Sequence, residues 1–342
     1  MIDPLIGARS IHFATTAIVA GTAFFGLFVS SPVFRQAGAG VHPEIAAYHR
    51  SIRQVAAAAL VIAVLSGAAW LLLLAVEIGN QFASEGITIG LVLTLLTKTQ
   101  IGFDWIVRLI LAALLSMLLM SGGDEPGPLR WRAAALALIA AAFIGGLAWA
   151  GHSGAAPGVA GNIQIAADVF HLIAAGAWIG GLVPFAMLMA LAFQTANQTT
   201  ILVARDATLR FSMLGIASVG MLLVTGIVNS WMLIGDLSNL IGNRYGQLLL
   251  IKAALFLIMI VVAAINRSVL TPKLVAGSKT TQTSAACAAV QQLQRNSLIE
   301  IGLGFAIIAI VGVLGTLPPH GKHEFTSGTP ISEGQSGQMH LH

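Results

Sequence analysis

The chain has 342 residues, of which 57% are hydrophobic and only 9% are charged. Because soluble domains carry about 25% charged residues, this composition excludes a soluble globular protein. The 17 basic residues outnumber the 13 acidic ones, but they are scattered between apolar runs and so indicate membrane topology rather than nucleic-acid binding. The single cysteine, Cys287, excludes an internal disulfide and any cysteine-based zinc site.

Apolar runs long enough to cross the roughly 30 Å hydrocarbon core of a bilayer recur along the whole chain. The sequence therefore predicts an all-α polytopic membrane protein, embedded in the lipid bilayer, with eight transmembrane helices. The polar segment 267–296 is predicted to be a flexible loop, and the tail 321–342, rich in Gly, Ser and His, is predicted to be a flexible arm. The eight predicted spans are 11–31, 54–78, 101–120, 132–151, 165–191, 211–235, 247–266 and 297–317.

Basic residues also predict the orientation of the chain. The connections after the first, third, fifth and seventh spans, with the adjoining helix ends, hold 11 of the 17 lysines and arginines. Because cytoplasmic loops carry the excess of Lys and Arg, this side is predicted to be cytoplasmic. Both termini are then periplasmic.

An internal duplication is suggested by two matches that occur in the same order along the chain. Residues 11–21 align with 170–180 on a shared histidine and glycine, and residues 101–114 align with 245–258 on a glycine and a basic residue. Each half starts and ends on the outer side, so the repeats are predicted to be parallel, related by an axis along the membrane normal. The predicted units are a first four-helix repeat (1–151), a second four-helix repeat (152–320) and the tail (321–342).

Four histidines are predicted to gather at the periplasmic face, because each lies at or near the outer end of its helix: His12, His152, His171 and His320. Imidazole is the commonest side-chain metal ligand, so the set predicts a metal or haem site. Asp168 precedes His171 by three residues and shares its helix face. It either binds the ion or orients the imidazole, whereas a purely structural pair is the alternative.

Other residues are weaker candidates. His323, His340 and His342 in the tail are possible accessory metal ligands. Arg108 and Lys252 could contact an anion or a haem propionate or else extend to the headgroups. The cytoplasmic half is predicted to hold only scattered methionines with Asn229, Asn266 and Glu300. Walker A and HExxH motifs are absent, so neither ATP-driven pumping nor other enzymatic activity is expected.

Five segments of the sequence resemble the copper resistance protein D family (CopD/PcoD). They are residues 168–185, 222–235, 245–256, 264–267 and 313–320. The resemblance implies a multi-pass protein of the bacterial inner membrane with eight helices, which handles or moves copper together with a periplasmic CopC-like copper carrier.

The leading hypothesis is therefore a copper-binding membrane protein that accepts copper ions from a periplasmic carrier or transports them. The alternative is an electron-transfer protein that binds haem b through the same histidines. A third possibility is a membrane scaffold in which the His and Asp side chains are purely structural.

Overall fold

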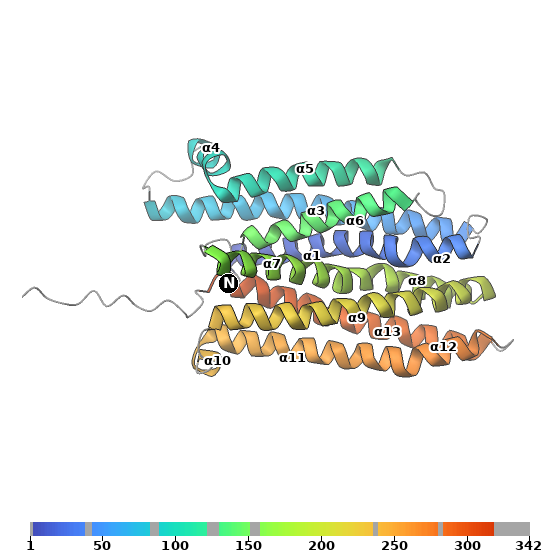
Figure 1. The fold of residues 1–342 in the computed structure, drawn as a ribbon. Coiled ribbons are helices and arrows are strands. Elements are labelled where there is room, and N and C mark those ends of the chain that lie inside the picture. Colours follow the sequence, from blue (N-terminus) through green and yellow to red (C-terminus); the bar gives the residue numbers. More distant parts are fainter. Residues whose placement is uncertain are drawn as a thin grey trace, which may run out of the picture.

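The computed structural model describes residues 3–37, 43–82, 89–121, 130–150, 158–234, 239–279 and 283–317, and within these ranges the regular structure is helical. In this part of the chain, eight helices are long and apolar enough to cross a membrane, as predicted. They lie side by side as one elongated bundle (Figure 1). The candidate spans are Pro4–Gln36, Pro43–Glu77, Gly102–Met120, Trp131–Ala150, Gly158–Thr195, Gln198–Met232, Arg244–Gly277 and Ser284–Leu314.

The elements of the first half of the chain build four of these spans. The short α4 precedes α5 at the end of the bundle where the N-terminus lies (Figure 1). In chain order the elements are α1 (Pro4–Phe25), η1 (Gly26–Ser30), α2 (Ser31–Gln36), α3 (Pro43–Phe82), α4 (Ile89–Lys98), α5 (Gln100–Met120), α6 (Arg130–Gly145) and η3 (Gly146–Ala150).

The second half follows a similar order, with the short α10 at the same end of the bundle as α4 (Figure 1). Its elements are α7 (Gly158–Ala175), η5 (Gly176–Gly180), α8 (Gly181–Thr195), α9 (Gln198–Ile234), α10 (Asn239–Gly242), α11 (Arg244–Ile265), η6 (Asn266–Leu270), α12 (Thr271–Gly277) and α13 (Thr283–Leu314).

Two spans form the centre of the bundle. The most apolar stretches of Pro4–Gln36 and Gly158–Thr195 are 67% and 72% buried, whereas no other candidate span exceeds 44%. These two spans cross at Gly21 and Gly180, where a Cβ atom on either glycine would collide with the backbone of the other helix. Small residues allow such close helix contact inside membranes, so this crossing fixes the core of the fold.

Among the described residues, three π-helical segments interrupt long helices of the bundle, namely η1, η5 and η6. A proline follows each of them by two to four residues: Pro32, Pro184 and Pro272. Proline lacks the N–H that would continue the helical hydrogen bonding and pushes against the preceding turn, which favours a wider turn just before it. The π segments are therefore encoded locally by these prolines.

The predicted flexible loop 267–296 is wrong, because most of it is helical. Residues 271–277 form α12 and residues 283–296 form the first half of α13. The side chains of Ala286, Ala289, Val290 and Leu293 are buried there. Their spacing of three and four residues forms one narrow apolar face, whose small side chains give only a weak signal in the sequence.

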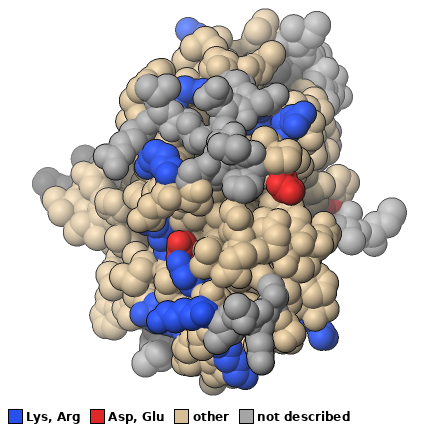
Figure 2. Space-filling model, turned by 90° about the vertical axis from the view of Figure 1, so that its right-hand side faces the viewer, with Lys and Arg blue, Asp and Glu red and all other residues tan. Residues whose placement is uncertain are grey.

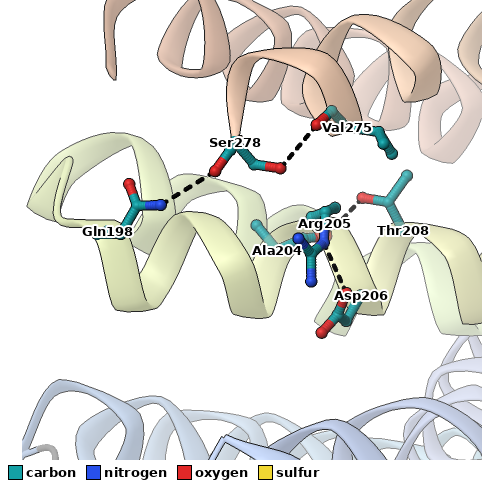
Figure 3. A network of polar contacts seen from close by, with 7 residues as sticks. All are labelled: Gln198, Ala204, Arg205, Asp206, Thr208, Val275 and Ser278. Atoms are coloured by element: carbon teal, nitrogen blue, oxygen red, sulfur yellow. Dashed lines mark hydrogen bonds and ion pairs between the residues drawn. The ribbon is translucent and has the colours of Figure 1, made fainter. Parts of the chain in front are cut away.

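Basic side chains gather at the end of the bundle where α2 and α12 lie, which Figure 2 views end-on. At this end, the Gln198 side-chain amide donates a hydrogen bond to the Ser278 carbonyl (3.0 Å), which joins the start of α9 to the end of α12 (Figure 3). Arg205 forms an ion pair with the neighbouring Asp206 (2.7 Å). We call this end of the bundle the basic end.

The first and last spans are tied together at the opposite end. Arg9 of α1 donates a hydrogen bond from Nη1 to the carbonyl of Gly315, just after α13 (2.8 Å). Its guanidinium also lies over the ring of Trp70 at 5.0 Å. Close by, a Cβ atom on Gly312 would collide with the Ser10 side chain. The bundle is thus closed between its first and last helices.

Candidate functional site

A cavity lies between α1, η3 and the helices of the second half, and it holds three of the predicted site residues. Its volume is about 730 Å³, and its walls come from α1, α7, η5, α9, α11 and α13 together with residues of η3. Asp168, His171 and Lys252 all line it. Because ligand sites measure about 300–1,000 Å³, the cavity has room for a cation and its remaining water ligands.

His171 is held by a hydrogen bond at one ring nitrogen, which leaves the other nitrogen available as a ligand. Its Nδ1 lies 2.9 Å from the Thr225 hydroxyl oxygen, and that hydroxyl donates its own hydrogen to the Met221 carbonyl (2.6 Å). The Thr225 oxygen must therefore accept from Nδ1–H, which places the proton of the neutral ring on Nδ1. The Nε2 atom then keeps its lone pair, and this is the form of imidazole that binds metal ions.

Asp168 and Asn229 form the polar pair next to His171. The Asn229 side-chain N–H donates to Asp168 Oδ1 (2.5 Å), and both residues line the cavity. The Asn229 Oδ1 atom is buried and has no hydrogen-bond partner among the described residues. The sequence predicts Asn229 in the cytoplasmic half and Asp168 at the periplasmic face, and this separation is wrong, because the Asn229 amide contacts the Asp168 carboxylate.

Lys252 balances the charge of this group. It interacts electrostatically with both Asp168 and His171, and Tyr245 interacts with Asp168 as well. The ammonium group therefore serves as the counter-ion of the carboxylate. A cation that enters the cavity would take over this role, with the imidazole nitrogen and the carboxylate and amide oxygens as its ligands.

His12 lies in a different setting from His171. It is 1% exposed, and its Nδ1 donates to the Ala63 carbonyl (2.7 Å). Its Nε2 accepts from Arg108 Nη2 (2.7 Å), and the same guanidinium donates from Nη1 to the Phe143 carbonyl (2.6 Å). Both ring nitrogens are thus occupied, so a metal ion at His12 would have to displace Arg108. The guanidinium is 2% exposed and also interacts electrostatically with the Asp104 carboxylate.

The remaining predicted ligands cannot be placed. His152, His320, His323, His340 and His342 lie outside the described residues. Within the ranges that the structure describes, no three His, Cys, Asp or Glu side chains come close enough to hold a metal ion. A complete histidine cluster is therefore not found in this part of the chain.

Further polar side chains meet deeper in the bundle, although the sequence predicts them only as scattered groups. Asn266 donates to the Glu300 carboxylate (2.7 Å), and Asn296 donates to Asn266 (2.6 Å). Trp178, which lines the cavity, also hydrogen-bonds Glu300. The spacing of Asn296 and Glu300, four residues apart on one helix, was a signal for this group.

Comparisons with known proteins agree with a role in copper handling. The family model for the N-terminal domain of copper resistance protein D-like proteins matches residues 1–162, and the model for copper resistance protein D matches residues 205–314. No solved structure matches the chain.

Two curated relatives match almost the whole chain. Copper resistance protein D of Pseudomonas syringae pv. tomato is 28% identical over 327 residues, which cover 93% of this chain and 98% of the relative. Inner membrane protein YebZ of Escherichia coli (strain K12) is 29% identical over 318 residues, which cover 92% and 98%. Copper transport protein CutJ of Bacillus subtilis (strain 168) is 31% identical over 105 residues, or 31% of this chain and 19% of CutJ.

The two family models fall on the two halves of the chain, and two relatives match it over more than nine tenths of its length. The chain therefore belongs to the copper resistance protein D family of multi-pass inner-membrane proteins.

Proposed function

We propose that the chain binds copper ions in the cavity beside His171 and Asp168 and takes part in moving them across the inner membrane, without catalysing a reaction. The observation that carries this proposal is the Nε2 lone pair of His171, held next to a carboxylate inside a membrane-spanning bundle. Ionisable groups inside a membrane are costly and usually mark an ion pathway. Copper suits a site of imidazole and carboxylate ligands.

The proposed duplication explains why the second half carries the site. In the proposed repeats His12 and His171 occupy equivalent positions. The Cε1 atom of His12 faces Gly67, which follows Ser66, and the Cε1 atom of His171 faces Gly226, which follows Thr225. The basic partners differ. In residues 1–151 an arginine bonds the histidine nitrogen, whereas in 152–320 a lysine at the matching position leaves the histidine open to the cavity.

The proposed orientation places the cavity on the periplasmic side. The basic end is cytoplasmic by the positive-inside rule, and Asp168 and Lys252 lie in the halves of their spans that are remote from it. A CopC-like carrier could then deliver copper from the periplasm. His152 and His320 would complete the ligand set, with His323, His340 and His342 as accessory ligands.

The test is to purify the protein in detergent without added metal and to measure its metal content and absorption spectrum. Wild type is compared with His171→Ala and with the matched control His49→Ala, since His49 lies on α3 outside the cavity lining. Copper that is present in wild type and in the control but absent from His171→Ala supports the proposal.

Other outcomes would overturn it. If His171→Ala retains copper, His171 is not a required ligand and the copper site lies elsewhere. A Soret band that disappears in His171→Ala would establish haem b and electron transfer instead. A wild-type protein that is colourless and contains no copper would favour the scaffold hypothesis. In that case the gene for His171→Ala should restore copper tolerance to a deletion strain as fully as the wild-type gene does.

A further inference from the structure

A row of polar side chains continues from the cavity toward the basic end. Along α7 and η5, Trp178 follows Asp168 by ten residues, about 15 Å of helix rise, and on α11 Met259 follows Lys252 by seven residues. Both Trp178 and Met259 line the cavity. They mark its inner end, where the open space stops and the bonded side chains begin.

Hydrogen bonds join this inner end to an exposed residue. Trp178 hydrogen-bonds the Glu300 carboxylate, to which Asn266 also donates (2.7 Å). Asn296 donates to the Asn266 side-chain oxygen (2.6 Å), and Gln292 donates to Asn296 (2.9 Å). Gln292 is exposed, so the row leads from the cavity lining to the surface.

The spacing of these residues along two helices shows that the row runs along the axis of the bundle. Gln292, Asn296 and Glu300 are four apart on α13, and Lys252, Met259 and Asn266 are seven apart along α11 and η6, so each set shares a helix face. From Gln292 to the cavity-lining Leu314, α13 rises about 33 Å, against about 30 Å of hydrocarbon. The cavity and the polar row together therefore extend over a length comparable to the thickness of the hydrocarbon core.

Glu300 has no cationic partner among the described residues. It is 2% exposed, and η5 and α8 contain no titratable side chain. Arg267 of η6 is exposed and donates to Ser212 (2.7 Å), while Arg295 of α13 and Lys273 of α12 are exposed.

Charged groups on the other neighbouring helices are also engaged elsewhere or distant along the chain. On α9, Arg205 pairs with Asp206 and Arg210 is exposed, and on α1, Arg9 and His12 bond Gly315 and Arg108. Lys252 of α11 lies two heptads from Asn266. A bare carboxylate at such a place is costly, so Glu300 requires either a proton or a nearby cation.

We infer that Glu300 is a proton-carrying group coupled to copper movement. Its O–H bond breaks when a copper ion reaches the inner end of the cavity, and the carboxylate then balances one positive charge of the ion. The proton leaves toward the basic end through water hydrogen-bonded to the amides of Asn266, Asn296 and Gln292. It returns when the ion moves on. This inference rests on the proposed function, because copper is the ion that displaces the proton.

The experiment measures the protons released when copper is added to the purified protein in weakly buffered detergent solution, with a pH-indicator dye as readout. Wild type is compared with Glu300→Gln, which keeps the shape and the acceptor oxygen, and with Glu77→Gln, which changes an exposed carboxylate of α3. We expect Glu300→Gln to bind as much copper as wild type but to release about one proton fewer per ion. Glu77→Gln should match wild type.

Equal proton release from Glu300→Gln and wild type, at equal copper content, would overturn the inference. If wild type binds no copper, the proposed function fails, and an infrared titration then tests Glu300 by itself. A carboxyl C=O band that is present in wild type and Glu77→Gln but missing in Glu300→Gln would show that Glu300 holds a proton. No such band in wild type would overturn the inference as well.

Discussion

Thr225 controls which nitrogen of His171 faces the cavity, because its hydroxyl donates to the Met221 carbonyl and so accepts only from Nδ1–H. Thr225→Val keeps the shape of the side chain but removes this acceptor. Partners that orient a ligating histidine are worth about 10–100-fold in metal affinity. We expect copper affinity, measured by competition with a chelator, to fall by a factor of this order.

Thr208→Val is the matched control for this substitution. Thr208 lies on the same helix, and its hydroxyl likewise donates to a carbonyl four residues earlier (Ala204, 2.7 Å), but it lies outside the cavity lining. Equal losses of affinity in the two variants would show that the effect is structural and would refute the role of Thr225.

Single residues were predictable from the sequence where their polarity contrasts with an apolar run, as for Asp168 and His171. Their partners were not, since Asn229 lies 61 residues from Asp168 in the chain and only the packing of α9 against α7 joins them. The sequence also treats His12 and His171 alike. They differ because the planar guanidinium of Arg108 reaches two acceptors at once, which the ammonium group of a lysine cannot match in geometry.

At the scale of the helices, the crossing of the first and fifth spans depends on glycine. A Cβ atom at position 180 would collide with the Ala17 carbonyl, so Gly180→Ala should force the two central helices apart. We expect a lowered midpoint of thermal unfolding in detergent, by several degrees or more, because overpacking typically costs about 1–3 kcal/mol.

Gly215→Ala provides the comparison for Gly180→Ala. A Cβ atom at position 215, on α9, would meet nothing within 4 Å, and alanine favours a helix over glycine by about 0.5–1 kcal/mol. This variant should therefore unfold at the wild-type temperature or above it. A Gly180→Ala variant that behaves in the same way would disprove the proposed role of the crossing.

Helices were predictable in number and type but less so in extent. Long apolar runs in a membrane must form helices, because every backbone polar group has to be satisfied within the segment. The start of α13 was missed since two of the four side chains on its buried face are alanines, and the spacing of the four is visible only once a partner helix is known. The π segments were only partly predictable, because the prolines that encode them indicate a kink in an apolar run but not the kind of wider turn.

At the scale of the whole molecule, the orientation can be tested with cysteines introduced into a Cys287→Ala background. Thr316→Cys lies just beyond α13, remote from the basic end, and Lys279→Cys lies at the basic end, with both positions exposed. A membrane-impermeant maleimide added to cells with a permeabilised outer membrane should label position 316 only. Labelling of position 279 alone would show that the orientation is the opposite of the one proposed and that the cavity lies on the cytoplasmic side.

The mean hydropathy of each span indicated in part which spans lie at the centre of the bundle and which face lipid. The two most buried spans are the least hydropathic of the eight, and Arg244–Gly277, the least buried, is the most hydropathic. Helices that face lipid need apolar side chains on all sides, whereas central helices can hold small and polar residues. Which central helices touch each other, however, depends on long-range packing that no local pattern specifies.

The closure between α1 and α13 has a consequence for biosynthesis. Residues 4–25 leave the ribosome before the second half of the chain, yet they pack against η5, α8 and α13, and the carbonyl that receives the Arg9 guanidinium belongs to residue 315. Until Gly315, 306 residues further along the chain, has been translated, Arg9 lacks that acceptor and α1 lacks its contacts with α13. Although α1 is made long before α13, its contacts are thus complete only after α13 has been inserted.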